Sequence, residues 1–263
     1  MKAARAGGSV LRDHLGRLTQ IETKHNQRNN LVTEADKASE RVIIDILRGY
    51  FPTHAILGEE GGSLPGSAEE RWIVDPLDGT TNFTHGLSLF SVSIAIERAG
   101  RVLAGVVYDP SADEMFAAEH GSGATVNGEP LHVSSVDDLA DAMLVTGFPY
   151  NVRENPYFCR ERFAAFLQHA QAVRRLGSAA LDCAYVAAGR IDGYWEVALQ
   201  PWDKAAGMLL IEEAGGRVTN FEGEKLDMFH PPFLGSNSLL HAQMLEVLEW
   251  ARAIHITLPE IPK

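Results

Sequence analysis

Acidic residues at the ends of apolar runs are the side chains of this sequence best suited to chemistry. Such acids stand within residues 58–60, 75–82, 195–196 and 202–203. A short apolar run is typical of a strand, which would deliver the acid that follows it to the edge of a sheet. Grouped carboxylates repel one another unless cations neutralise them, and their hard oxygens select magnesium, calcium or manganese. The pattern therefore predicts a site for divalent cations.

The segment around Asp75 and Asp78 is the most informative of the four. Residues 72–74 predict a buried strand, and Pro76 is expected to stop it and force a turn. The two aspartates flank that turn, close enough to bind neighbouring metal ions. Leu77 has no ligand in its side chain, but its carbonyl oxygen can serve as one. This segment alone would supply ligands to adjacent cations.

Gly79 and Thr80 follow directly and suit an anion. Their backbone N–H groups would stand at the start of a short helix, where they could hold a phosphate oxygen. The net charge of −12 means that an anionic substrate would need positive charge from bound cations. Cations and backbone donors would together stabilise the charge that develops on a transferring phosphoryl group. The sequence has no Walker-type GxxxxGK[ST] loop.

Each acid also has an ordinary structural interpretation, which the residues taken singly leave open. Residues 75–79 form a good turn pattern, with proline second and glycine last. The other interpretations are a capping box with Thr33 for Asp36, a solvated loop edge for Glu59 and Glu60, an edge-strand surface position for Glu196 and a helix N-cap for Asp203. The joint presence of these acids in this order favours a common site.

The hydrophobic pattern predicts a layered α/β protein. An amphipathic helix is expected over residues 33–50, and Gly105 is expected in a turn. Strands are expected near 55–58, 72–74, 90–97, 102–108 and 114–118, with a hairpin turn at Ala99 and Gly100. The remaining chain alternates helices near 154–171, 179–188, 204–214 and 239–253 with strands near 172–175, 193–195, 217–218 and 234–235.

These elements predict two halves that form one compact unit. Residues 1–147 would be an α+β half with a largely antiparallel sheet and the metal-binding motifs. Residues 148–263 would be an α/β half with a mixed sheet that completes the site.

Composition excludes several classes of protein. The chain has 263 residues, 45% of them apolar, which suffices for a large core. Residues 1–16 have no apolar signal-peptide centre and no run of about 18 apolar residues occurs, so we expect a cytoplasmic protein without a membrane partner. Cys159 and Cys183 fit neither a disulfide framework nor a zinc site and are expected to be buried. The negative net charge argues against a nucleic-acid partner.

With these motifs in this order, the sequence resembles the inositol monophosphatase family over nearly its whole length. The run Asp-Pro-Leu-Asp-Gly-Thr-Thr-Asn, combined with the later Trp-Asp, is highly specific. The matching segments are residues 31–36, 58–60, 72–83, 105–108, 174, 176–180, 201–203, 206–207 and 213–216. The resemblance implies a five-layer αβαβα sandwich that hydrolyses a small phosphorylated polyol or sugar, foremost inositol monophosphate.

The resemblance also implies a metal site with two to three magnesium ions. The first ion would be held by Glu59, Asp75 and the Leu77 carbonyl, and the second by Asp75, Asp78 and Asp203. A weaker third ion would lie near Glu59. Inhibition by lithium and a homodimer are further expectations from the family.

The remaining site residues follow from the same resemblance. Asp36 and the Thr80 hydroxyl would orient and deprotonate the attacking water, with Glu59 also catalytic and with no covalent phosphoenzyme. Gly79 and Thr80 would bind the phosphate. The substrate would also contact Asp78, Gly177, Ser178, Ala179 and Glu196.

Two positions depart from the family pattern. A lysine often precedes Leu-Val-Thr by several residues, but that register here holds His25, with Lys24 one place earlier. Lys204, directly after Asp203, stands where an apolar residue is common.

Three alternatives stay open at this point. The first is a relative in the same superfamily that acts on 3'-phosphoadenosine 5'-phosphate, NADP, fructose 1,6-bisphosphate or histidinol phosphate. The nucleotide branch typically carries lysine after Asp-Gly-Thr, where this chain has Thr81. The second, a haloacid dehalogenase type of phosphatase, needs an Asp-x-Asp motif that Asp78 does not complete. The third is a regulatory binding protein that retains the fold, which the complete set of ligand positions disfavours.

Overall fold

The computed structural model describes residues 1–23 and 30–254, so Lys24 and His25 lie outside the described residues. Its helices are α1 (Lys2–His14), α2 (Glu34–Tyr50), α3 (Thr80–Thr84), α4 (Cys159–His169), α5 (Ala179–Ala187), α6 (Pro201–Glu213) and α7 (His241–Trp250). Across the described ranges, every helix falls short of the length and apolar character that a membrane span needs.

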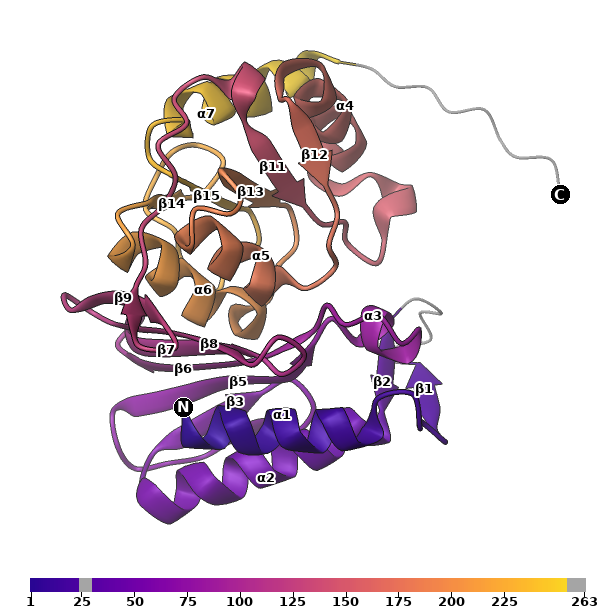
Figure 1. Ribbon diagram of the computed structural model, residues 1–263, viewed down its shortest axis with the longest axis vertical. Helices are drawn as coiled ribbons and strands as arrows, with labels where there is room; N and C mark the ends of the chain where they lie inside the picture. Colours follow the sequence, from indigo (N-terminus) through magenta and orange to yellow (C-terminus); the bar gives the residue numbers. More distant parts are fainter. Residues whose placement is uncertain (24–29, 255–263) are drawn as a thin grey trace, which may run out of the picture.

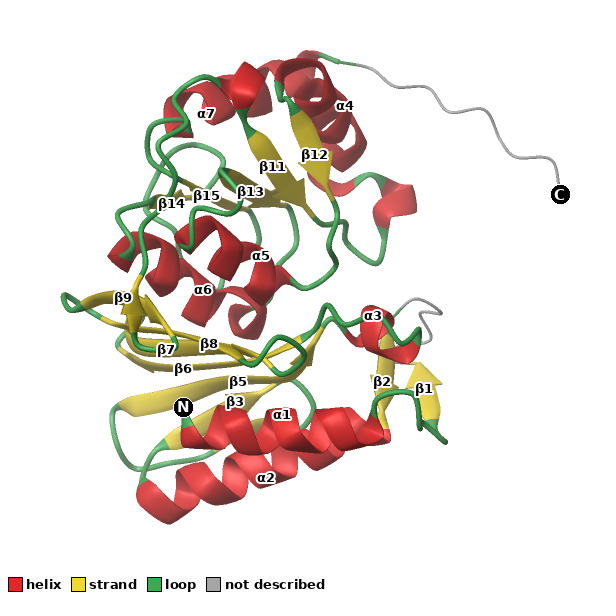
Figure 2. Ribbon diagram, in the orientation of Figure 1, coloured by secondary structure: helices red, strands yellow, loops and turns green. Residues whose placement is uncertain are grey.

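The described elements stack in five layers (Figures 1 and 2). Helices α1 and α2 cover the outer face of a larger sheet, and α5 and α6 lie between it and a smaller sheet. Helices α4 and α7 cover the far side of the smaller sheet. Three apolar clusters fill the spaces between layers, and Cys159 and Cys183 are buried as predicted. The expected αβαβα sandwich is confirmed.

The helix predicted over residues 33–50 is confirmed as α2, with Thr33 as its N-cap. The Thr33 hydroxyl accepts hydrogen bonds from the backbone N–H groups of Ala35 and Asp36. In return, the Asp36 carboxylate accepts from the Thr33 N–H (2.8 Å) and hydroxyl (2.6 Å). This capping box confirms the structural interpretation of Asp36. The same bonds fix the carboxylate at the start of α2, so that it has one orientation toward the site.

The larger sheet is antiparallel except where β3 and β5 pair in parallel. In spatial order its strands are β10 (Glu129–Pro130), β9 (Gly123–Val126), β8 (Glu114–Glu119), β7 (Arg101–Asp109), β6 (Ser91–Arg98), β5 (Glu70–Asp78), β3 (Ala55–Gly58) and β4 (Gly62–Leu64). The predicted hairpin turn joins β6 to β7 through Ala99 (φ 50°) and Gly100 (φ 78°). A small ribbon, β1 (Ile21–Thr23) with β2 (Leu31–Thr33), precedes α2.

Pro76 does not end its strand, contrary to prediction. Strand β5 continues to Asp78, and its pairing with β6 shifts register between Asp75 and Asp78. Residues three apart on a regular strand point to opposite faces of the sheet, and an irregularity of this kind re-aims side chains. The shift therefore allows both aspartates to face the same side, with the Leu77 N–H donating to the Asp75 carboxylate at 3.0 Å.

The smaller sheet is mixed, as predicted. Its strands in spatial order are β12 (Ala172–Arg174), β11 (Met143–Thr146), β13 (Gly193–Glu196), β15 (Phe233–Ser236) and β14 (Arg217–Thr219). Strand β11 was not predicted; it pairs in parallel with β12 and β13 and lies before residue 147 in the chain. The division into halves at that residue stays a prediction. Helix α4 begins later than residue 154, because 3₁₀ turns with Asn155 in the left-handed region precede it.

Helix α6 docks on the larger sheet through two close contacts. Gly105 lies inside β7 and not in a turn, contrary to prediction. Glycine is needed at this position because a side chain would collide with the helix: a Cβ atom would stand 2.8 Å from the Ala206 Cα. The Ser93 hydroxyl of β6 donates to the Trp202 carbonyl at 3.1 Å. These contacts fix the position of the start of α6 on the face of the larger sheet. The helix begins at Pro201, earlier than predicted.

Replacing Gly105 by alanine should destabilise the protein, by about 1–3 kcal/mol, because the added methyl group meets backbone atoms of α6. The measurement is the free energy of unfolding from urea titration. Gly49→Ala in α2 is the matched control: a Cβ there meets no atom within 4 Å, and alanine favours the helix. Equal effects of the two substitutions would contradict the proposed close contact.

Candidate active site

A cavity of about 420 Å³ opens where the larger sheet, α5 and the smaller sheet meet. Its walls are rich in carboxylates, and among its described lining residues Arg175 carries the positive side chain. The acids that line it are Glu59, Asp75, Asp78, Asp182, Glu196 and Asp203. Residues from distant parts of the chain thus form one acidic cleft.

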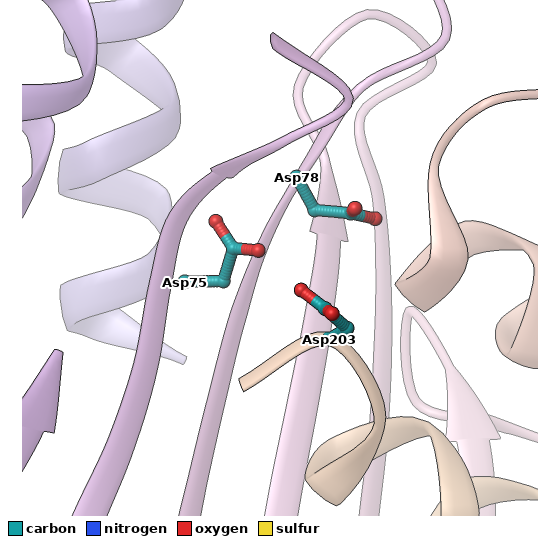
Figure 3. Close-up of side chains that lie close together, drawn as sticks. All are labelled: Asp75, Asp78 and Asp203. Carbon is teal, nitrogen blue, oxygen red and sulfur yellow. The ribbon is translucent and has the colours of Figure 1, made fainter. Parts of the chain in front are cut away.

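Asp75, Asp78 and Asp203 form the centre of this cleft. One carboxylate oxygen of each lies within 4.8 Å of the others. Figure 3 shows the three side chains pointing toward one another, the first two from the end of β5 and the third from the start of α6. Asp203 lies in the first turn of α6, at the third helical position, and accepts a hydrogen bond from the Gln200 N–H (2.7 Å). Gln200 is therefore the N-cap, and the N-cap interpretation of Asp203 is wrong.

The Asp78 carboxylate ties the larger sheet to α5, because it lies at the N-terminus of that helix. It accepts hydrogen bonds from the backbone N–H groups of Ala180 (2.8 Å) and Ala179 (3.2 Å) and a short one from the Ser178 hydroxyl. The Ser91 hydroxyl of β6 is a weaker donor at 3.4 Å. Free N–H groups at a helix start favour negative charge, so α5 holds this carboxylate in place.

Glu59 reaches the same cleft from the loop after β3. Its backbone N–H donates to the Val74 carbonyl at 3.1 Å, which places it beside the strand residue that precedes Asp75. The two carboxyl groups are near enough for Glu59 to raise the pKa of Asp75. Glu59 is half-buried and lines the cavity, so the solvated-loop interpretation is wrong for it.

Burial and mutual repulsion make this cluster reluctant to ionise. Burial raises the pKa of Asp75 and Asp203 well above the usual range, and neighbouring carboxylates, Glu59 first, raise it further. Burial also raises the pKa of Asp78 to about 6, although the bonds from α5 act in the opposite direction. Positive charge nearby would lower the pKa of all three acids and so favour their ionised form at neutral pH.

Divalent cations fit this requirement. The cluster supplies hard carboxylate oxygens from two chain segments. Leu77, which also lines the cavity, has a carbonyl that can serve as a further oxygen ligand. Within the described residues the cluster contains no histidine or cysteine, which zinc would favour. Asp75, Asp78 and Asp203 would hold the cation directly, with Glu59 beside them.

Asp36 is the predicted site residue that does not line the cavity. It is fully buried, with an exposed fraction of 0%, and lies behind Thr80, whose hydroxyl donates to the Asp36 carboxylate at 3.3 Å and to the Leu77 carbonyl at 3.1 Å. Thr80 itself lines the cavity. The Thr80 hydroxyl therefore connects the Asp36 carboxylate to the cavity.

The other predicted site residues all line the cavity: Glu59, Asp75, Leu77, Asp78, Gly79, Thr80, Gly177, Ser178, Ala179, Glu196 and Asp203. Gly79 is the N-cap of the short helix α3 and has φ of 96°. A side chain there would crowd the carbonyl oxygens of Leu89 (2.9 Å) and Gly177 (3.2 Å), so glycine is needed on two grounds. The roles of these residues stay predictions.

Glu196 lies on β13, a central strand, so the edge-strand interpretation is wrong. Its carboxylate accepts a 2.6 Å hydrogen bond from the Tyr194 hydroxyl, and burial raises its pKa to about 7. Gly147 leaves room for it, since a Cβ at that position would lie 2.0 Å from the Glu196 Oε2 atom.

Asp182 and Asn82 are among the residues of the site that sequence reasoning missed. Asp182 lines the cavity, and its Oδ1 atom is buried without a hydrogen-bond partner. It stands one helical turn after Ser178, so helical periodicity from that motif could have found it. Asn82 donates to the carbonyls of Leu89 and Leu176, both at 2.7 Å, and so ties α3 to the Gly177 loop. No local pattern indicates those partners.

Lys204 has a structural task. Its side chain is fully buried, and its Nζ donates a short hydrogen bond to the His230 carbonyl in the loop before β15. Burial lowers its pKa to about 8. The lysine therefore ties that loop to α6 beside the acidic cluster.

Comparisons with known proteins agree with this geometry. The model of the inositol monophosphatase family matches residues 1–252. Nus factor SuhB of Pseudomonas aeruginosa is 46% identical over 228 residues, which cover 85% of this chain and 84% of that protein. The solved structure of extragenic suppressor protein suhB from Bartonella henselae has a TM-score of 0.89 at 38% identity and covers 94% of this chain and 96% of that one.

An inositol monophosphatase structure from Anabaena (Nostoc) sp. PCC 7120 has a TM-score of 0.84 at 42% identity and covers 95% of this chain and 93% of that one. The sequence comparison and the structure comparison therefore indicate the same family over nearly all of the chain. The chain belongs to the inositol monophosphatase family.

Proposed function

We propose that this protein is a magnesium-dependent phosphatase that hydrolyses a small phosphomonoester, foremost inositol monophosphate. One observation carries the proposal: three carboxylates converge beside Gly79 and Thr80 in a single cavity. The cavity volume, about 420 Å³, is in the range of small-molecule sites. The similarity to an inositol monophosphatase supports the same substrate class.

Magnesium would be held by Asp75, Asp78 and Asp203, with Glu59 and the Leu77 carbonyl completing the oxygen donors. When bound, it would supply positive charge for the phosphate and lower the pKa of a bound water. The chain would add the backbone N–H groups at the start of α3 as phosphate donors.

Asp36 and Thr80 would act on the attacking water. The Thr80 oxygen would accept a hydrogen bond from the water, while its own proton is directed to the Asp36 carboxylate. As the water oxygen bonds to phosphorus, its proton would pass through Thr80 to Asp36. The bond from phosphorus to the ester oxygen breaks, and the leaving alkoxide would take a proton from solvent water. Asp36 would then return its proton to solvent, so that no net proton is gained or lost by the protein.

The alcohol end of the cavity favours hydroxyl groups over a second phosphate. Asp182 and Glu196 would form hydrogen bonds with the hydroxyl groups of a polyol, whereas a second phosphate would need positive charge at a place where two acids lie around Arg175. Burial raises the pKa of both acids, Asp182 well above the usual range and Glu196 to about 7, and the nearby Arg175 offsets a part of this rise. This arrangement disfavours the fructose 1,6-bisphosphate alternative. Lithium inhibition, a homodimer and a cytoplasmic location stay expectations from the family.

A second function is motivated by the name Nus factor SuhB that several relatives carry. It is the regulatory binding role that the sequence left open. The two functions can be separated by complementation: a strain that lacks this protein receives either the wild type or Asp75→Asn. Rescue by a variant without phosphatase activity would establish the regulatory role.

Asp75→Asn should lower the rate of phosphate release from inositol 1-phosphate by orders of magnitude. Asp75 is central to the carboxylate cluster, and asparagine offers one weak oxygen where a charged ligand is required. The assay compares wild type and variant with and without magnesium, and circular dichroism checks the fold. Activity of wild type without magnesium, or near-normal turnover of folded variant, would refute the proposed function.

Asp36→Asn should lower kcat by about 100- to 10,000-fold while the magnesium concentration for half-maximal rate stays close to wild type. Asparagine keeps an oxygen for the capping box but is a poor proton acceptor. The measurement is kcat as a function of magnesium concentration. A variant that recovers the full rate at higher magnesium would show that Asp36 acts on the metal and not on water.

Magnesium should stabilise the protein far more at pH 8 than at pH 5. Because the pKa of Asp78 is raised to about 6 in the folded state and those of Asp75 and Asp203 rise too, the metal-free protein binds more protons when folded. The stability from these neutral acids is fully present below about pH 4, their unfolded pKa, and is lost as the pH rises through 6 and above. Thermal unfolding with magnesium chloride or potassium chloride at equal ionic strength measures this. An equal shift at both pH values would contradict it.

A further inference from the structure

One face of α2 contacts three separate pieces of the proposed site. Asp36 reaches Thr80, as described above, and the Ser39 hydroxyl donates to the Pro76 carbonyl at 2.9 Å. The Glu40 Oε1 atom accepts a hydrogen bond from the Glu60 N–H at 3.1 Å. Positions i, i+3 and i+4 lie on the same side of a helix, so these three side chains act from one rigid surface.

Glu40 is a buried acid that the proposed mechanism does not use. Its exposed fraction is 6%, and it is not among the residues that line the cavity. The loop after β3 is folded closely around its carboxylate. A Cβ atom at Gly58 would stand 2.3 Å from the Glu40 Oε1 atom, and one at Gly61 would stand 3.0 Å from Oε2. Both glycines therefore make room for this one side chain.

Glu59 lies between the points at which this loop is held. On one side its own N–H is bonded to the Val74 carbonyl of β5 at 3.1 Å. On the other side the next N–H, that of Glu60, is bonded to Glu40 at 3.1 Å. The peptide groups that flank the Glu59 Cα are thus fixed, one to the strand and one to the helix. Its carboxylate leaves this backbone toward Asp75.

We propose that Glu40 is a positioning residue that holds Glu59 in place for cation binding, and that glycine is required at position 58 to leave space for the Glu40 carboxylate. This inference rests on the metal-dependent function proposed above. A residue behind a metal ligand typically changes metal affinity or activity by about 10- to 100-fold when removed. Glu40→Ala should therefore raise the magnesium concentration for half-maximal rate by about 10-fold or more. Since the residues that orient the water and bind phosphate are unchanged, kcat at saturating magnesium should stay near wild type.

Glu40→Gln tests whether the hydrogen bond or the charge matters. The glutamine oxygen can accept from the Glu60 N–H in the same space, so metal dependence should remain within a few-fold of wild type. A metal affinity as weak as that of Glu40→Ala would overturn the positioning role. Leu47→Ala, a buried position of the same helix packed in the apolar cluster, controls for loss of stability. It should lower the thermal midpoint without changing the metal dependence.

Gly58→Ala tests the same contact from the other side. Its methyl group would displace the Glu40 carboxylate and should weaken metal binding as Glu40→Ala does. In the Glu40→Ala background, where there is no carboxylate to displace, Gly58→Ala should have little further effect. Independent, multiplying effects of the two substitutions would overturn the proposed contact.

Calorimetric titration of the substrate-free protein with manganese chloride gives a readout apart from activity. Wild type and Glu40→Gln should bind the ion alike, and Glu40→Ala and Gly58→Ala should bind it about 10-fold more weakly or worse. If wild type neither binds the ion nor hydrolyses the ester, the proposed function itself fails. If wild type binds it and Glu40→Ala binds it equally well, the role of Glu40 alone is refuted.

Discussion

Three carboxylates held together in a buried cleft are the constraint on which the rest of this structure depends. Each disfavours ionisation of its neighbours, and burial disfavours it further, as the raised pKa values of Asp75, Asp78 and Asp203 show. An unrestrained chain would let these side chains move apart into water. The fold prevents this, because every segment that carries one of them is anchored to a sheet or a helix.

The anchors come from both sides of the cleft. The shifted register of β5 aims Asp75 and Asp78, the start of α5 binds the Asp78 carboxylate, and the contact of α6 with Gly105 sets the position of Asp203. The N-termini of α5 and α6 both lie against the acids. N–H groups that have no partner inside their helix donate to the carboxylates there and offset part of the negative charge. The site is thus a product of how the two sheets are held relative to each other, and its charge is only partly compensated by the protein.

The parts of this arrangement that are predictable from sequence are local. The capping box of Thr33 and Asp36, the strand before Asp75 and the helix start after Gly79 depend on residues a few positions apart, and the resemblance supplied the order in which they combine. The register shift at Pro76, strand β11 and the contact of Glu40 with the Gly58 loop depend on partners distant in the chain. Residue type and spacing cannot specify such partners, because many pairings satisfy the same local pattern.

The same energetics bear on the choice between an enzyme and a binding scaffold. A scaffold that works through its surface has no physical need for repelling acids in a buried cleft, and neutral residues of similar shape at these positions would remove the repulsion. The cleft instead combines that unfavourable charge with an open cavity, a glycine at the start of α3 that brings backbone N–H groups close, and a hydroxyl bonded to a fully buried aspartate. Each of these features has a use when a cation and a phosphate ester occupy the cavity. The proposed hydrolysis of a phosphate ester gives all of these features a use at one place, and binding of a partner at the surface gives a use to none of them.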